Sequence, residues 1–161
     1  MNRGARSARS RQLSVARTRR ETDHAEERCR RRLASIQVLF VAGNCGFRAT
    51  VAYFTHLLGY TAHTADAVTS ALTVLRRVPV DIIVVEEEQD VPVLSTTLSA
   101  QGHVDVLVIP IALVITQEDI ARWRERGAFS CIPKPFDLGT YRTALMVAAT
   151  EMCARRAARA L

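Results

Sequence analysis

The chain contains a single lysine, and it lies in a stretch whose residue types suit the binding of an anion. Lys134 lies in the stretch CIPKPF at 131–136, whereas the other 21 basic residues are arginines. An ammonium group is a compact point charge, whereas a guanidinium is a broad planar fork. A lysine retained in so arginine-rich a chain predicts a confined site in which the ammonium group binds a carboxylate or a phosphoryl group end-on. The alternative is that the lysine was retained by chance.

A second candidate for chemistry is an acidic residue at the end of an apolar segment. Glu86 directly follows residues 81–85 (DIIVV), and Glu87, Glu88 and Asp90 come next. A carboxylate at the end of a buried strand can hold a cation or pair with a lysine. We interpret Glu86 as a site residue and the three acidic residues after it as a solvated loop.

The cysteines offer little metal chemistry. Cys29, Cys45, Cys131 and Cys153 are widely spaced, without a Cys-x-x-Cys pair or a matching pair of histidines. This usage is typical of reduced thiols in an intracellular protein, and we expect neither a zinc site nor any other metal. Cys45 begins a predicted helix, where the helix dipole favours a thiolate, so a redox role is a minor alternative.

The net charge of +6 is unevenly distributed along the chain. Residues 1–33 hold eleven arginines and four acidic residues, a net of +7, whereas residues 34–161 hold eleven basic and twelve acidic residues, a net of −1. We predict a disordered tail that ends in a short lead-in helix over 1–33, and one folded domain over 34–161.

No apolar run reaches about 18 residues, so we expect no membrane insertion. The Arg/Ser-rich start is superficially similar to a transit peptide, but a cytoplasmic location is favoured.

Strand-like and helix-like segments alternate from residue 36 onward. Continuous apolar strands that alternate with helices predict an α/β domain with a five-stranded parallel sheet covered on both faces. Gly59, Gly102 and Gly127 are expected to end three of the helices, and Asp66 and Thr116 to cap two of them. The predicted strands are 36–41, 60–65, 81–85, 104–109 (or 111–115) and 129–132, and the predicted helices span about 47–58, 67–77, 91–102, 117–126 and 138–159.

The carboxyl ends of these strands define the expected site. Chemistry in open parallel sheets gathers at that edge, where the strand order reverses. The residues at the predicted strand ends are Ala42-Gly43-Asn44, Glu86, Pro110 and Lys134.

At this point the sequence resembles the receiver domain of bacterial response regulators, over about residues 35–150. The resemblance rests on an ordered set of short motifs: VLFV at 38–41, Gly59-Tyr60, VDIIVVE at 80–86, RGA at 126–128 and KPFDL at 134–138. It implies a flavodoxin-like, doubly wound sheet with strand order 2-1-3-4-5. It also implies a role in two-component, phosphorelay-type signalling.

In that family, an acidic pair after the first strand and an aspartate after the third hold Mg²⁺, and the aspartate accepts the phosphoryl group. Carried over by position, the acidic pair falls on Ala42 and Gly43 and the phosphoacceptor on Glu86, while the lysine is present as Lys134. Neither Ala42 nor Gly43 can ligate a cation through its side chain. Phosphoryl transfer relies on the cation to offset charge, so the resemblance predicts a degenerate site without a cofactor.

Two further positions of the family pattern are also altered. The hydroxyl residue after the fourth strand falls on Pro110, or on Thr116 if that strand is 111–115. The switch aromatic is replaced by Cys131. The extra methylene of Glu86 brings its carboxylate toward Lys134, and a standing ion pair between the two is predicted. It either imitates the phosphorylated state or only fills the pocket.

We therefore expect a stand-alone pseudo-receiver that is no enzyme and acts by phosphorylation-independent protein–protein interaction. The expected partner is a signalling protein or a histidine kinase-related protein, with homodimerisation through the last strand and helices as a further expectation. The expected contact surface includes Trp123, Phe129 and Tyr141. One alternative is binding of nucleic acid or another anionic surface by residues 1–33. Another is a receiver still phosphorylated on Glu86 or Asp90.

Overall fold

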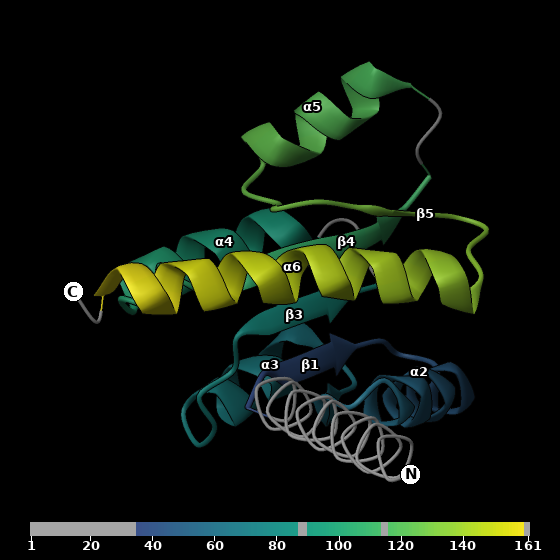
Figure 1. The fold of residues 1–161 in the computed structure, drawn as a ribbon, viewed down its shortest axis with the longest axis horizontal. Helices are drawn as coiled ribbons and strands as arrows, with labels where there is room; N and C mark the ends of the chain where they lie inside the picture. Colours follow the sequence, from purple (N-terminus) through teal and green to yellow (C-terminus); the bar gives the residue numbers. More distant parts are fainter. Residues whose placement is uncertain (1–34, 87–89, 114–115, 160–161) are drawn as a thin grey trace, which may run out of the picture. The chain divides into compact units, whose positions relative to one another are not determined.

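Five parallel strands form the centre of the domain in the computed structural model, which describes residues 35–86, 90–113 and 116–159. Their order is β2-β1-β3-β4-β5, and this confirms the predicted fold class and strand order. Figure 1 shows β1, β3, β4 and β5 following one another across the sheet. The predicted tail and lead-in helix within residues 1–33 lie outside the described residues. The strands are β1 (Gln37–Val41), β2 (Thr61–Ala65), β3 (Ile82–Val85), β4 (Leu107–Ala112) and β5 (Ile132–Pro133).

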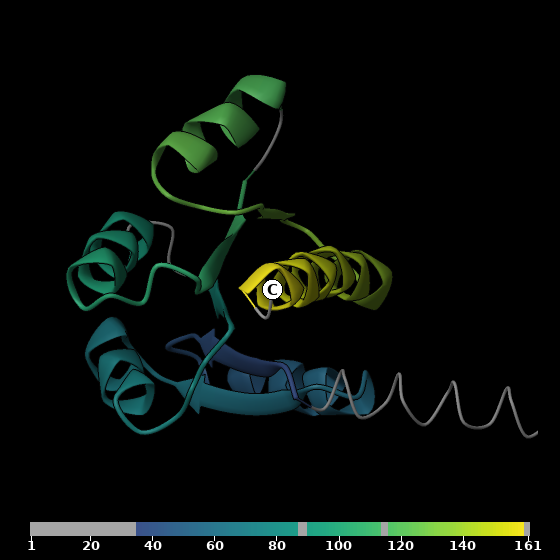
Figure 2. The same ribbon diagram turned by 60° about the vertical axis from the view of Figure 1, so that its left-hand side comes forward.

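Helices cover both faces of this sheet (Figure 2). On one face, buried side chains of β1, β3 and β4 pack against α3, α4 and α5 in a single aliphatic core that also contains Trp123. On the other face, α2 and α6 contribute the buried residues Val51 and Leu145. The helices in chain order are α2 (Cys45–Leu57), α3 (Val68–Leu75), α4 (Asp90–Ala100), α5 (Gln117–Glu125) and α6 (Leu138–Arg159).

Local sequence signals explain where the site-bearing helices begin. The Asn44 side chain accepts a hydrogen bond from Phe47 N at 2.9 Å and caps α2. The Asp137 carboxylate accepts one from Thr140 N at 2.7 Å in the first turn of α6. These bonds satisfy backbone donors that have no partner inside the helix, so each helix starts directly after its strand. The Lys134–Pro135 peptide bond is cis, as the X-Pro pair allowed.

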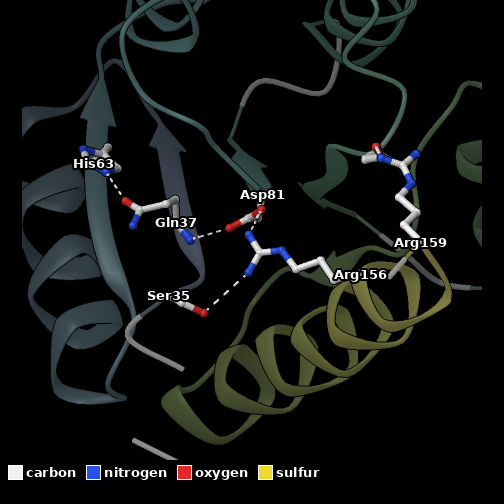
Figure 3. Close-up of polar contacts among 7 residues, drawn as sticks. Ser35, Gln37, His63, Asp81, Arg156 and Arg159 are labelled. Carbon is white, nitrogen blue, oxygen red and sulfur yellow. Dashed lines mark hydrogen bonds and ion pairs between the residues drawn. The ribbon is translucent and has the colours of Figure 1, made fainter. Parts of the chain in front are cut away.

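The far end of α6 is fastened to the amino edge of the sheet (Figure 3). The Arg156 guanidinium donates to Asp81 Oδ1 at 2.6 Å, and Gln37 N donates to Asp81 Oδ2 at 2.8 Å. Arg159, one turn further along, pairs with Asp105. Because Gln37 begins β1 and Asp81 precedes β3, the last turns of α6 are held against the start of two central strands.

The structure corrects several predicted boundaries. The fourth strand runs over 107–112 and not 104–109, and Val104 is 64% exposed in the loop before it. The fifth strand is the short 132–133 pair, so residues 129–131 precede it. Helix α4 begins at Asp90 and ends at Ala100, two residues before Gly102. Asp66 does not cap α3: the N-cap is Ala67.

Within the described ranges, none of the helices has both the length and the apolar content that crossing a membrane requires.

Candidate functional site at the carboxyl edge of the sheet

The structure brings the predicted site residues of three strands to one edge. Strands β1 and β3 are neighbours, with Val41 opposite Val85, and Glu86 N donates to Val41 O at 2.9 Å. Ala42 and Gly43 therefore follow β1 beside Glu86. On the other side of the site, Lys134 N donates to the Ala112 carbonyl at 2.9 Å and so fixes the start of the loop after β5.

Arg48, which was not among the predicted site residues, contacts Ala42 and Gly43. The Arg48 side chain reaches back from the first turn of α2, and its Nη1 donates to Ala42 O at 2.5 Å and to Gly43 O at 3.3 Å. Helical side chains point toward the helix N-terminus, which explains how a residue of α2 reaches the end of β1. The edge thus carries a guanidinium that donates to both carbonyl oxygens directly after β1.

The charge of Arg48 also reaches the neighbouring strand end. The pKa of Asp66 is lowered, chiefly because the Ser70 hydroxyl donates to its carboxylate, with a smaller contribution from the positive charge of Arg48. Asp66 follows β2 directly. The Asp66 carboxylate is therefore already engaged with Ser70 of α3 and is a poor candidate for a metal ligand.

The predicted ion pair between Glu86 and Lys134 is not formed. The ion pairs among residues 35–86, 90–113 and 116–159 involve Arg122, Arg155, Arg156 and Arg159, and neither Glu86 nor Lys134 takes part in one. Lys134 is exposed and Glu86 is half-buried. The prediction was wrong: the added methylene of Glu86 does not produce an ion pair with Lys134, whose side chain is exposed in the loop after β5.

Neither predicted residue lies at the hydroxyl position. Pro110 is buried inside β4, opposite Val85, two residues before the strand ends. The end of β4 is Ala112, beside Lys134, and Ala112 has no hydroxyl group. Thr116, the alternative, caps α5, where its hydroxyl accepts a hydrogen bond from Asp119 N at 3.3 Å.

Cys131 is half-buried and packs against the aliphatic core, one residue before β5. Burial raises the pKa of the Cys131 thiol above its ordinary value. A raised pKa lowers the fraction of thiolate, so this cysteine is a packing residue and a weak nucleophile. Cys45 is exposed at the first position of α2, where a redox role stays a prediction.

Two of the three residues predicted for the contact surface are buried. Trp123 is 6% exposed in the core beneath α5, and Tyr141 is 2% exposed. Both were misassigned because a large aromatic side chain on an amphipathic helix suits a core as well as an interface. Phe129 is half-buried, and Met146 and Val147 are exposed on α6 at 51% and 52%.

The side chains present at this edge do not fit Mg²⁺. The ion prefers octahedral oxygen ligands with at least one or two carboxylates, and Glu86 is the one carboxylate that directly follows β1 or β3. In the described part of the chain, no group of three His, Cys, Asp or Glu side chains converges anywhere. The Arg48 guanidinium, moreover, already donates to the two carbonyl oxygens at the end of β1. Glu87 and Glu88 lie outside the described residues.

Sequence reasoning missed Arg48, although a signal for it existed. A basic residue in the first turn of a helix opposes the helix dipole, so its presence there needs a local acceptor. Arg48 lies in the first turn of α2, and neither this turn nor the segment between β1 and α2 contains an acidic side chain. Such a residue is expected to turn back toward the backbone oxygens before the helix.

Comparison with solved structures identifies proteins of similar fold. No family model matches the chain, and no curated protein matches it. Solved structures do match. The chemotaxis response regulator CheY4 of Vibrio cholerae is 18% identical with a TM-score of 0.61, and the match covers 70% of this chain and 98% of that one. An orphan response regulator of H. pylori is 16% identical with a TM-score of 0.62, over 72% of this chain and 98% of that one.

A receiver domain of a Francisella response regulator is similar over 72% of this chain and 98% of its own length, at 14% identity and a TM-score of 0.60. These likenesses agree with the strand order of the sheet. The chain has the fold of a response-regulator receiver domain.

Proposed function

We propose that this domain is a pseudo-receiver: a signalling module of the two-component type that acts through protein contact and independently of phosphorylation. The observation that carries the proposal is the guanidinium of Arg48 on the carbonyl oxygens of Ala42 and Gly43. A receiver needs a divalent cation at this edge to offset the charge of the phosphoryl oxygens. Here a fixed monovalent cation without open coordination positions stands beside Glu86.

In such a module the carboxyl edge of the sheet keeps one conformation and does not switch. The guanidinium is tied to the backbone by hydrogen bonds that do not depend on a ligand, and Ala112 has no hydroxyl with which to follow a phosphoryl group. Among the residues that the structure describes, Lys134 has no ion-pair partner. A module of this kind presents the same surface at all times. We propose no enzymatic activity for it, and a cytoplasmic location.

The contact surface that we propose lies on the exposed side of α6 near β5. Met146 and Val147 are large apolar residues that are half exposed, and Phe129 lies half-buried before β5. They replace the buried Trp123 and Tyr141 as candidate contact residues. The partner that fits such a surface is a signalling protein, or a second copy of this chain.

The test is an NMR titration of the ¹⁵N-labelled full chain, first with Mg²⁺ and then with beryllium fluoride, which imitates a bound phosphoryl group. We expect no saturable shift of the amides of Gly43, Glu86 or Lys134 at millimolar Mg²⁺. Saturable shifts at these three residues, with further shifts along α5, would show a working receiver and would refute the proposal. A shift of the Glu86 amide alone, without saturation, would indicate nonspecific screening of charge. It would agree with the proposal, because it shows no saturable Mg²⁺ binding.

A further inference from the structure

An apolar cavity of about 630 Å³ opens between α2, the end of β4 and the loop from β5 to α6. Phe47, Val51 and Phe54 line it from α2, and Phe136 and Tyr141 line it from the opposite side. Cavities of roughly 300–1,000 Å³ with such a lining are typical of small-molecule sites. This cavity is therefore large enough for a ligand of the size of two or three fused rings.

The walls of the cavity are held by a continuous series of aromatic contacts. The ring centroids of Phe40 and Phe47 lie 5.5 Å apart, those of Phe47 and Phe136 6.1 Å, and those of Phe136 and Tyr141 6.2 Å. Phe40 and Tyr141, at the two ends of the series, are 1% and 2% exposed. Because both ends are anchored in the core, the cavity is preformed and does not depend on rearrangement by a ligand.

One uncommitted cation belongs to the lining. Lys134 is exposed, and within the described part of the chain its ammonium group makes neither an ion pair nor a hydrogen bond. The other charged lining residue is Asp137, whose carboxylate is held by Thr140 N at 2.7 Å in the first turn of α6. The backbone bond to Thr140 is also the main reason that the pKa of Asp137 is lowered.

We propose that this cavity binds a small amphipathic anion. Its apolar body, a ring system or a short aliphatic chain, packs between Phe47, Phe54 and Phe136, and its single carboxylate or sulfonate pairs with Lys134. A charge pair at the edge of an apolar cavity is stronger than one in open water because nearby water screens it less. The inference does not depend on the proposed function, since it holds whether or not Glu86 can be phosphorylated.

Two matched probes separate the apolar contribution from the charge. Anilinonaphthalene sulfonate carries the anion, and N-phenylnaphthylamine is its uncharged parent. Isothermal titration of the full chain is expected to give one site for each probe, with the sulfonate bound more tightly. Lys134→Met should weaken the sulfonate about tenfold, the size of one charge-assisted hydrogen bond, and leave the neutral probe unchanged. Lys134→Arg should retain most of the affinity.

Two further variants locate the site. Thr50→Trp places a bulky ring in the cavity from an exposed position on α2, and should abolish binding of both probes. Arg142→Met removes an exposed charge from α6 outside the cavity lining and should change neither affinity. The proposal fails if no probe binds, if Thr50→Trp binds both probes normally, or if Lys134→Met and Arg142→Met weaken the sulfonate equally. Circular dichroism of each variant confirms that it is folded.

Discussion

The hydroxyl oxygens of Tyr141 and Thr55 lie 2.6 Å apart in the interior, where they join α6 to α2. Thr55 also donates to Val51 O at 2.7 Å, so its single proton is committed to its own helix and Tyr141 is the donor of the shared bond. Burial raises the pKa of Tyr141 to about 12. The phenol is therefore held in its protonated form as part of the contact between the two helices.

This contact predicts a specific loss of stability in alkali. The ordinary pKa of the phenol is 10.0, so between pH 10 and 12 the unfolded chain loses a proton that the folded chain keeps. The stabilising contribution is complete below pH 10 and falls by about 2 kcal/mol as the pH approaches 12. Denaturant unfolding of Tyr141→Phe should show this dependence reduced by that amount. Tyr53→Phe, which changes a tyrosine that is 61% exposed, is the control and should behave as the parent chain.

The ion pair between Arg156 and Asp81 should contribute measurably to stability. Asp81→Ala removes the acceptor of both Arg156 and Gln37 N and leaves a part-buried backbone donor without a partner. We expect a loss of about 2 kcal/mol in the free energy of unfolding, measured by urea denaturation. Arg156→Met leaves the bond from Gln37 intact and should cost about 1 kcal/mol, since this side chain is 45% exposed.

The matched control for the ion pair between Arg156 and Asp81 is Arg159→Met. Arg159 pairs with Asp105, but the two side chains are 63% and 34% exposed, so solvent screens the interaction and the expected cost is below about 0.5 kcal/mol. Equal losses for the two arginine variants would mean that the burial of Asp81 does not strengthen its ion pair.

Gly127 is expected to tolerate no side chain. Its φ is +93°, and a Cβ would lie 2.5 Å from Ser95 Oγ and 2.7 Å from Ser95 Cβ. Gly127→Ala should therefore lower the stability by about 2–3 kcal/mol, from left-handed strain together with overpacking. Gly102→Ala has a similar φ of +77° but an open environment, so it reports the backbone strain alone, about 1 kcal/mol. A thermal melt in which both variants lose the same stability would contradict the packing contribution.

Restoring carboxylates to the edge should revive metal binding only when Arg48 is removed. Gly43 has nothing within 4 Å of an added Cβ, so Gly43→Asp fits without strain. Combined with Glu86→Asp it supplies two carboxylates, but Arg48 would pair with the new one. We expect Mg²⁺ binding, measured by calorimetry, for the triple variant with Arg48→Ala and at least tenfold weaker binding without that change. The same pair combined with Arg142→Ala is the control and should resemble the double variant.

The fold was predictable because its signals are local. Residues 82–85 form a continuous apolar run and are buried on both faces, as a central parallel strand requires. Thr116 caps α5 through its own side chain, so the predicted start of this helix was confirmed. The fourth strand was misplaced because the apolar run 106–115 is longer than one strand, and pairing with β3 and β5 selects its register.

The site was predictable only in part. Ala42, Gly43, Glu86 and Lys134 each follow a strand, and the parallel topology alone brings them to one edge. The contact of Arg156 with Asp81 joins residues 75 positions apart and leaves no periodic trace in the sequence. Whether Trp123 is covered depends on α4 and Ala128, so its burial could not be deduced from its own helix.

The two anchored ends of α6 have a consequence for its motion. Tyr141 joins the helix to α2 near the carboxyl edge, and Arg156 joins it to Asp81 at the amino edge. At 1.5 Å per residue these anchors are about 22 Å apart, which makes the helix a brace along the sheet. Its central backbone amides cannot exchange with deuterium by fraying from either end. We expect them to open only when the domain unfolds, so within residues 35–86, 90–113 and 116–159 the middle of α6 should hold some of the slowest-exchanging amide protons.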